Sequence, residues 1–137
     1  MELGTEGAPP VRAWSLFPVN SSGTWVPTLT NVANIDASTA FTCQFLRLDR
    51  CVVCSGKADI DPTVGGGTLT RMRMSLPVAP AAFTATEQAG GAGAATTVAG
   101  EVAPIRAGVA FTSVEWRWNT INAANASYPF WFMYFLG

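Results

Sequence analysis

The sequence predicts an all-β protein: one antiparallel β-sandwich, jelly-roll-like, of about seven or eight short strands. Short runs of alternating apolar and polar residues recur along the chain, and Gly, Pro and Asn residues separate them. No segment shows the apolar spacing of three and four residues that is typical of a helix. A chain of 137 residues is ordinarily a single domain with its own core.

Residues 1–22 are predicted to form an extended N-terminal arm, and residues 23–137 the sandwich domain. Several prolines and glycines in the arm oppose a helix, because proline lacks an amide donor and clashes with the preceding turn. The arm nevertheless carries bulky apolar side chains that are costly to expose to water. We expect these side chains to dock on a larger partner: Val11, Trp14, Leu16 and Phe17.

In the first half of the domain, alternation predicts three strands. Residues 24–29 form the first, and Pro27 suits an edge position because it cannot donate to a neighbouring strand. Residues 41–48 form the second, with successive side chains on opposite faces. A hairpin turn at 49–50 leads into the third strand, residues 52–60.

The second half of the domain continues the pattern. Residues 68–76 alternate apolar and polar side chains. Residues 88–100 have almost no side-chain bulk, which predicts either a strand that permits close backbone approach or a loop pressed against a neighbour. Three further strands are predicted at 102–107, 109–119 and 130–136.

The chain is poor in charge, with 12% charged residues against 49% apolar residues. This is about half the usual charged share, and it fits a subunit that buries surface against neighbours. The net charge is −1, and basic residues concentrate nowhere beyond Arg71-Met72-Arg73, so no nucleic-acid partner is predicted.

The N-terminus lacks the pattern of a secretory signal, and the longest apolar run, 128–136, is too short for a membrane-spanning helix. We therefore expect synthesis in the cytoplasm and no membrane partner.

Residue types suited to catalysis or metal binding are scarce. Histidine is absent, which removes the commonest general base and metal ligand. Cys51 and Cys54 have the spacing of redox and zinc motifs, but positions three apart on a strand point to opposite faces, and zinc needs four ligands. Two aspartates, Asp59 and Asp61, are too few for a calcium site. No catalytic, cofactor-binding or metal-binding residue is predicted, and the protein is expected not to be an enzyme.

The last predicted strand is apolar on both faces. The core can cover one face, and a second copy of the chain is expected to cover the other. The predicted interface of a homotrimer, or alternatively a dimer, consists of Phe130, Trp131, Phe132, Met133, Tyr134 and Phe135. A second interpretation is a sugar-stacking surface that includes Tyr128 and Trp131, while Trp116 and Trp118 are expected to fill the core.

Three sequence blocks resemble a domain of tailed-bacteriophage virion proteins, often found at the C-terminus of tail fibres. They are residues 23–32 (GTWVPTLTNV), 37–47 (ASTAFTCQFLR) and 53–63 (VCSGKADIDPT), and the likeness covers about residues 23–136. The resemblance implies a β-sandwich knob, usually homo-oligomeric, on the outside of a virion, with no catalytic residues. Only about 22 residues precede the knob, which favours a short appendage or a capsid decoration protein over a distal fibre tip.

Together, these observations predict a non-enzymatic structural protein on the virion surface. Its expected partners are further copies of itself and a larger virion protein, such as the major capsid protein or a tail component. The alternative is a host-receptor or carbohydrate-binding module of a tail-fibre tip. A hydrolase acting on surface polysaccharide would need two acidic residues facing each other, and nothing in the sequence pairs Glu87, Glu101 and Glu115.

Overall fold

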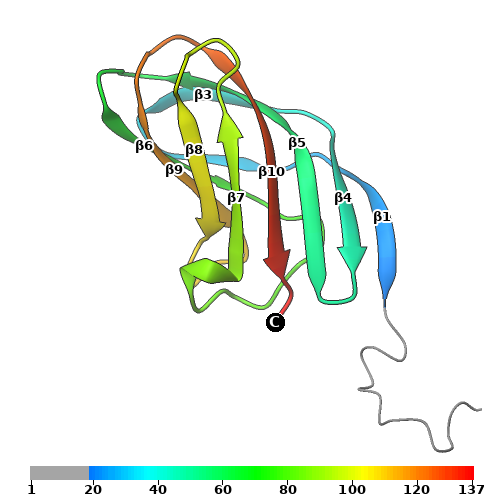
Figure 1. Ribbon diagram of the computed structural model, residues 1–137. Helices are drawn as coiled ribbons and strands as arrows, with labels where there is room; N and C mark the ends of the chain where they lie inside the picture. The colour runs from blue at the N-terminus through cyan, green and yellow to red at the C-terminus, as the bar shows by residue number, and fades with distance from the viewer. Residues whose placement is uncertain (1–18) are drawn as a thin grey trace, which may run out of the picture.

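The computed structural model describes residues 19–137 (Figure 1). Ten strands and a single turn of 3-10 helix make up this part of the chain. In chain order the elements are β1 (Asn20–Trp25), β2 (Leu29–Ala33), β3 (Ile35–Ala40), β4 (Cys43–Leu48), β5 (Cys51–Pro62), β6 (Thr68–Met74), η1 (Thr86–Gln88), β7 (Ala89–Ala94), β8 (Val102–Ala107), β9 (Val114–Thr120) and β10 (Ala126–Phe135).

The strands form one antiparallel sheet in the order β1-β4-β5-β10-β7-β8-β9-β6-β2, and β3 pairs with β5. The segment from β2 to β3 curls this sheet. β2 pairs with β6 at one end of the strand order, and β3, which follows after Asn34, pairs with the far half of β5 near the other end. One continuous segment therefore links distant parts of the sheet and brings them round a common interior (Figure 1).

Over residues 19–137 the all-β class and the antiparallel pairing are confirmed, but this part of the chain has ten strands instead of seven or eight. Two local features explain the difference. Pro27 separates β1 from β2, so the first predicted strand is divided, and β3 consists mostly of small and polar residues that give little alternation. No helix within residues 19–137 has the length and apolar character to cross a bilayer.

Strand β1 begins at Asn20, before the predicted end of the arm at residue 22. Residues 20–22 pair with Leu48, Arg47 and Leu46 of β4. They therefore belong to the sheet. The division of the described chain into two packed layers in jelly-roll order stays a prediction.

The core lies on the concave inner side of the sheet, and the Trp116 ring lies at its centre. This ring is fully buried and makes edge-to-face contacts with Phe130, Tyr128 and Trp118 at centroid distances of 5.3, 6.4 and 6.3 Å. Trp118 is also buried. The prediction that both tryptophans fill the core is confirmed.

The small residues of β7 let these rings pack closely. A Cβ atom on Gly93 would lie 2.6 Å from the Trp116 ring, and one on Gly91 would lie 2.2 Å from the carbonyl oxygen of Trp131. Residues 89–94 therefore form the strand of close approach that the sequence predicts. The predicted segment 88–100 is thus a strand only over 89–94: Gln88 ends η1, and residues 95–100 form a connecting loop.

Replacing Gly93 by alanine is expected to lower the free energy of unfolding by about 1–3 kcal/mol, because the added methyl group displaces the Trp116 ring. Urea denaturation measures the change. Gly90→Ala is the matched control on the same strand, since a Cβ there would meet no atom within 4 Å. Equal effects of the two substitutions would contradict the packing account.

Candidate functional site

Strand β10 presents two different sets of side chains. Phe130, Phe132 and Tyr134 point inward and are buried, whereas Trp131 and Phe135 point outward and are 55% and 48% exposed. The alternation follows from strand geometry, in which successive side chains leave opposite faces. Large aromatic rings therefore stand on the solvent side of a central strand.

The outward residues of β10 continue an apolar surface across two further strands. Met133 pairs with Val53 of β5, which pairs with Leu46 of β4. Directly paired residues lie on the same face of a sheet, so these side chains are neighbours. A second row runs parallel to the first and consists of Phe135, Cys51 and Leu48. We call the whole surface the apolar sheet face: Leu46, Leu48, Cys51, Val53, Trp131, Met133 and Phe135.

Two shallow hollows lie along the apolar sheet face. One has a volume of about 350 Å³ and is bordered by β7 and β10, including Ala92, Pro129 and Trp131. The other has a volume of about 280 Å³ and is bordered by β1, β4 and β5, including Leu46 and Val53. The face therefore offers a projecting indole ring and depressions that could receive an apolar group.

The predicted interface needs a correction. Phe130, Phe132 and Tyr134 are core residues of the single chain, so their side chains cannot contact a second copy. Trp131, Met133 and Phe135 remain on the outer face. The sequence could not distinguish the two sets, because both faces of this strand are apolar.

The predicted glycan contact is corrected in the same way. Tyr128 is 1% exposed, and its hydroxyl group donates to the Glu101 carboxylate inside the fold. Only Trp131 of that predicted pair faces solvent. The predicted docking residues Val11, Trp14, Leu16 and Phe17 lie outside the described residues.

Glu101 is a buried carboxylate with a structural arrangement of hydrogen bonds. Besides the Tyr128 hydroxyl, the indole N–H of Trp118 donates to it at 3.2 Å and the amide of Ile121 donates at 2.7 Å. Burial, the hydrogen bond to Glu101 and the charge of that carboxylate together raise the pKa of Tyr128. Glu115 lies on β9 and forms ion pairs with two arginines, and Glu87 is exposed in η1. The hydrogen bonds and ion pairs of these three glutamates are all to other residues, so none of them faces another as an acidic pair would.

The cysteines are free thiols on two sides of the sheet. Cys51 lies on the apolar sheet face, while Cys54 and Cys43 are buried in the core. The predicted divergence of Cys51 and Cys54 is therefore confirmed. Burial, with a smaller contribution from Cys43, raises the pKa of Cys54 to about 12. Within residues 19–137, no group of three or more His, Cys, Asp or Glu residues is arranged to hold a metal ion.

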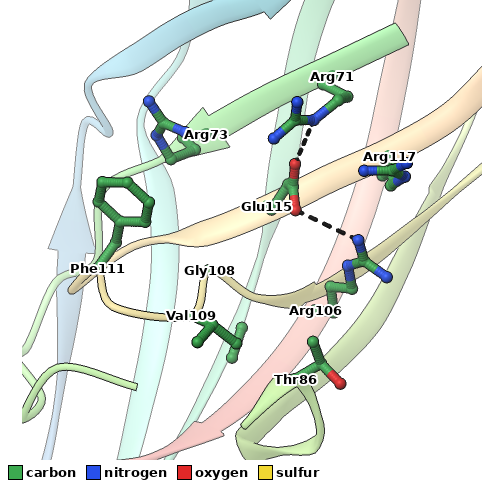
Figure 2. A pocket seen from close by; sticks show the side chains of 10 residues that line it. Arg71, Arg73, Thr86, Arg106, Gly108, Val109, Phe111, Glu115 and Arg117 are labelled. Atoms are coloured by element: carbon green, nitrogen blue, oxygen red, sulfur yellow. Dashed lines mark hydrogen bonds and ion pairs between the residues drawn. The ribbon is translucent and has the colours of Figure 1, made fainter. Parts of the chain in front are cut away.

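A second surface feature escaped the sequence analysis. Four arginines from three strands border a cavity of about 280 Å³ on the outer side of β6, β8 and β9 (Figure 2). Glu115 lies among them, and its carboxylate contacts Arg71 Nε at 2.6 Å and Arg106 Nη2 at 3.5 Å. Only Arg71 and Arg73 are close in sequence. Strand pairing brings Arg106 and Arg117 to them, which no local pattern reveals.

Comparison of the chain with protein-family models, with curated proteins and with solved structures finds no match.

The raised pKa of Cys54 predicts a loss of stability in alkali. Below about pH 9 the thiol is neutral in both the folded and the unfolded state. Between about pH 9 and 12 the unfolded chain releases this proton while the folded chain retains it, so the free energy of unfolding falls by about 1.4 kcal/mol per pH unit. Urea denaturation across this range should show a smaller slope for Cys54→Ala, although the buried tyrosines still contribute. An unchanged slope would contradict the assignment.

Proposed function

We propose that the protein is a non-enzymatic structural subunit of a tailed-bacteriophage virion, which self-associates through the apolar sheet face. The proposed assembly is a short appendage or capsid decoration on the virion surface. The N-terminal arm docks it on a larger component, such as the major capsid protein or a tail protein. In this proposal the curled sheet corresponds to the jelly-roll-like sandwich knob of the phage domain that residues 23–136 resemble.

The apolar sheet face is the observation that carries the proposal. Its members include four large side chains that are 45–55% exposed: Leu46, Leu48, Trp131 and Phe135. No charged side chain belongs to the face, and its outward neighbours on β1 and β7, such as Ser22, Gly90 and Ala92, are also uncharged. Contiguous exposed apolar surface of this kind marks an interaction site, since leaving it in water is unfavourable.

A second copy of the chain is the occupant that best fits this face. A homo-oligomer needs no second gene product, and its interface is typically more apolar than the average protein surface. The hollow beside Trp131 and the hollow over β4 and β5 lie on the same side of the sheet as the projecting indole. The same face could therefore supply both the projecting group and the depression that receives it.

Trp131→Glu is expected to weaken self-association at least about 30-fold. Removing an aromatic anchor from the centre of an interface typically costs about 2 kcal/mol of binding free energy, which corresponds to this factor. Size-exclusion chromatography with light scattering measures the mass of each variant over a range of concentrations. Val64→Glu is the matched control, because Val64 is equally exposed (53%) but lies off the face. Similar masses for the two variants would argue against this interface.

Deleting residues 1–18 tests the proposed anchor. The truncated chain keeps β1 and should retain its fold and its oligomeric mass, because no described strand is removed. It should fail to bind virus particles that have been stripped of this subunit. Retained binding in a co-sedimentation assay would reject the role of Val11, Trp14, Leu16 and Phe17 in docking.

Trp131 also favours a second candidate, a carbohydrate-binding module. An exposed indole beside a hollow of about 350 Å³ is suited to stacking on a sugar ring. A glycan array with the unmodified protein and with Trp131→Ala distinguishes the two functions. The structural proposal predicts no bound glycan that depends on Trp131, whereas binding that disappears in the variant would favour the receptor-binding function.

A further inference from the structure

Half of the chain's eight Lys and Arg residues surround one cavity. We call this site the arginine cleft, and it consists of Arg71, Arg73, Arg106, Phe111, Glu115 and Arg117. Four arginines and one glutamate give it a formal charge of +3, although the whole chain has a net charge of −1. Positive charge is therefore concentrated at a single place on an otherwise charge-poor protein.

The charges within the cleft are not balanced by the fold. Arg71 lies directly opposite Arg117 in the β6–β9 pair, and like charges in this position repel. Glu115 contacts Arg71 and Arg106 only, so Arg73 and Arg117 have no carboxylate partner within residues 19–137. The Nε atom of Arg106 is buried and has no hydrogen-bond acceptor in the same part of the chain. An anion bound among these groups would remove the repulsion and supply the missing acceptors.

The cleft also has a fixed apolar wall. Val109 and Phe111 project from the β8–β9 loop beside the arginines (Figure 2). Two main-chain hydrogen bonds join this loop to Phe83, from Ala110 N to Phe83 O at 2.8 Å and from Phe83 N to Phe111 O at 3.0 Å. Ala110 is held at a φ of 72°, a conformation that costs energy for any residue except glycine. The loop is thus anchored in a definite position.

Arg73 is oriented by the same wall. Its guanidinium group lies over the Phe111 ring, 4.4 Å from the centroid. This contact leaves the edge of the guanidinium group, which carries the donors, available to an acceptor. The flat, apolar ring of Phe111 therefore lies next to the N–H donors of Arg73, which remain available to an acceptor.

We propose that the arginine cleft binds a phosphate group carried on a sugar-sized body. Guanidinium groups bind phosphate oxygens through paired charge-assisted hydrogen bonds. Donors that approach from β6, β8 and β9 match a tetrahedral dianion better than a planar, singly charged carboxylate. Phe111 and Val109 would contact the apolar side of the attached body, and Glu115 would position Arg71 and Arg106. The site is separate from the apolar sheet face, and the inference does not depend on the proposed function.

Isothermal titration calorimetry on the full chain tests the inference with four probes: glucose 6-phosphate, inorganic phosphate, glucuronate and glucose. Glucose 6-phosphate should bind most tightly and inorganic phosphate more weakly, because it lacks the sugar body. Glucuronate should bind about tenfold more weakly than glucose 6-phosphate, and glucose should not bind. Added salt should weaken the binding of both phosphates.

Arg73→Gln and Arg117→Gln should each weaken the binding of glucose 6-phosphate by about tenfold or more. Arg50→Gln is the matched control, since Arg50 is exposed, lies at the β4–β5 turn and gives the same change in charge. Its affinity should equal that of the unmodified protein. An equal loss of affinity in Arg50→Gln, or no binding of either phosphate to the unmodified protein, would overturn the proposal. Glucuronate binding as tight as that of glucose 6-phosphate would reject phosphate as the preferred group.

Thermal denaturation without ligand shows whether a variant is destabilised, and so distinguishes a loss of affinity caused by poor folding from one caused by the missing guanidinium group. Arg117→Gln removes the repulsion with Arg71, so its melting temperature should equal or exceed that of the unmodified protein. At the same concentration, glucose 6-phosphate should raise the melting temperature of the unmodified protein more than that of the variant, because the variant binds it more weakly. A lower melting temperature for Arg117→Gln without ligand would mean that Arg117 stabilises the fold, and it would contradict the argument from unbalanced charge.

Discussion

The Trp116 ring fills the space left by Gly93 and packs edge-on against Phe130. This contact joins β9 to the adjacent strands β7 and β10, from which β8 separates it in the order of the sheet. Because side chains alternate along a strand, fixing Trp116 inward also fixes Glu115 and Arg117 outward. Fixing Phe130 inward fixes Trp131 outward in the same way. One packing contact thus determines the composition of the two outer surfaces for which we propose functions.

The two surfaces share the outer side of one sheet but differ in chemistry. The apolar sheet face covers β4, β5 and β10, and the arginine cleft covers β6, β8 and β9. Strand β7 lies between them and presents only small residues outward, such as Gly90 and Ala92. An apolar contact with a second copy and an anion site could therefore operate on one subunit, because each is built on different strands.

The sequence predicts features that depend on neighbouring residues of one strand, and it does not predict features that depend on pairing between distant strands. Alternation along 114–119 identifies Trp116 and Trp118 as core residues, because charged neighbours mark the opposite face. The same alternation fails along 130–136, where every side chain is apolar and only the surrounding sheet decides which set is buried. Strand β3 gives little signal because its residues are small and polar. The arginine cleft gives none, since Arg71 and Arg117 meet only through the long-range pairing of β6 with β9.

The central claim is that a second copy covers the apolar sheet face. Sedimentation equilibrium of the unmodified protein tests this claim most directly, because it reports mass without reference to shape. The chain has a mass of 14.4 kDa, and the account predicts a whole-number multiple of that value that falls only on dilution. A mass of 14.4 kDa at every concentration, with the protein remaining in solution, would contradict it.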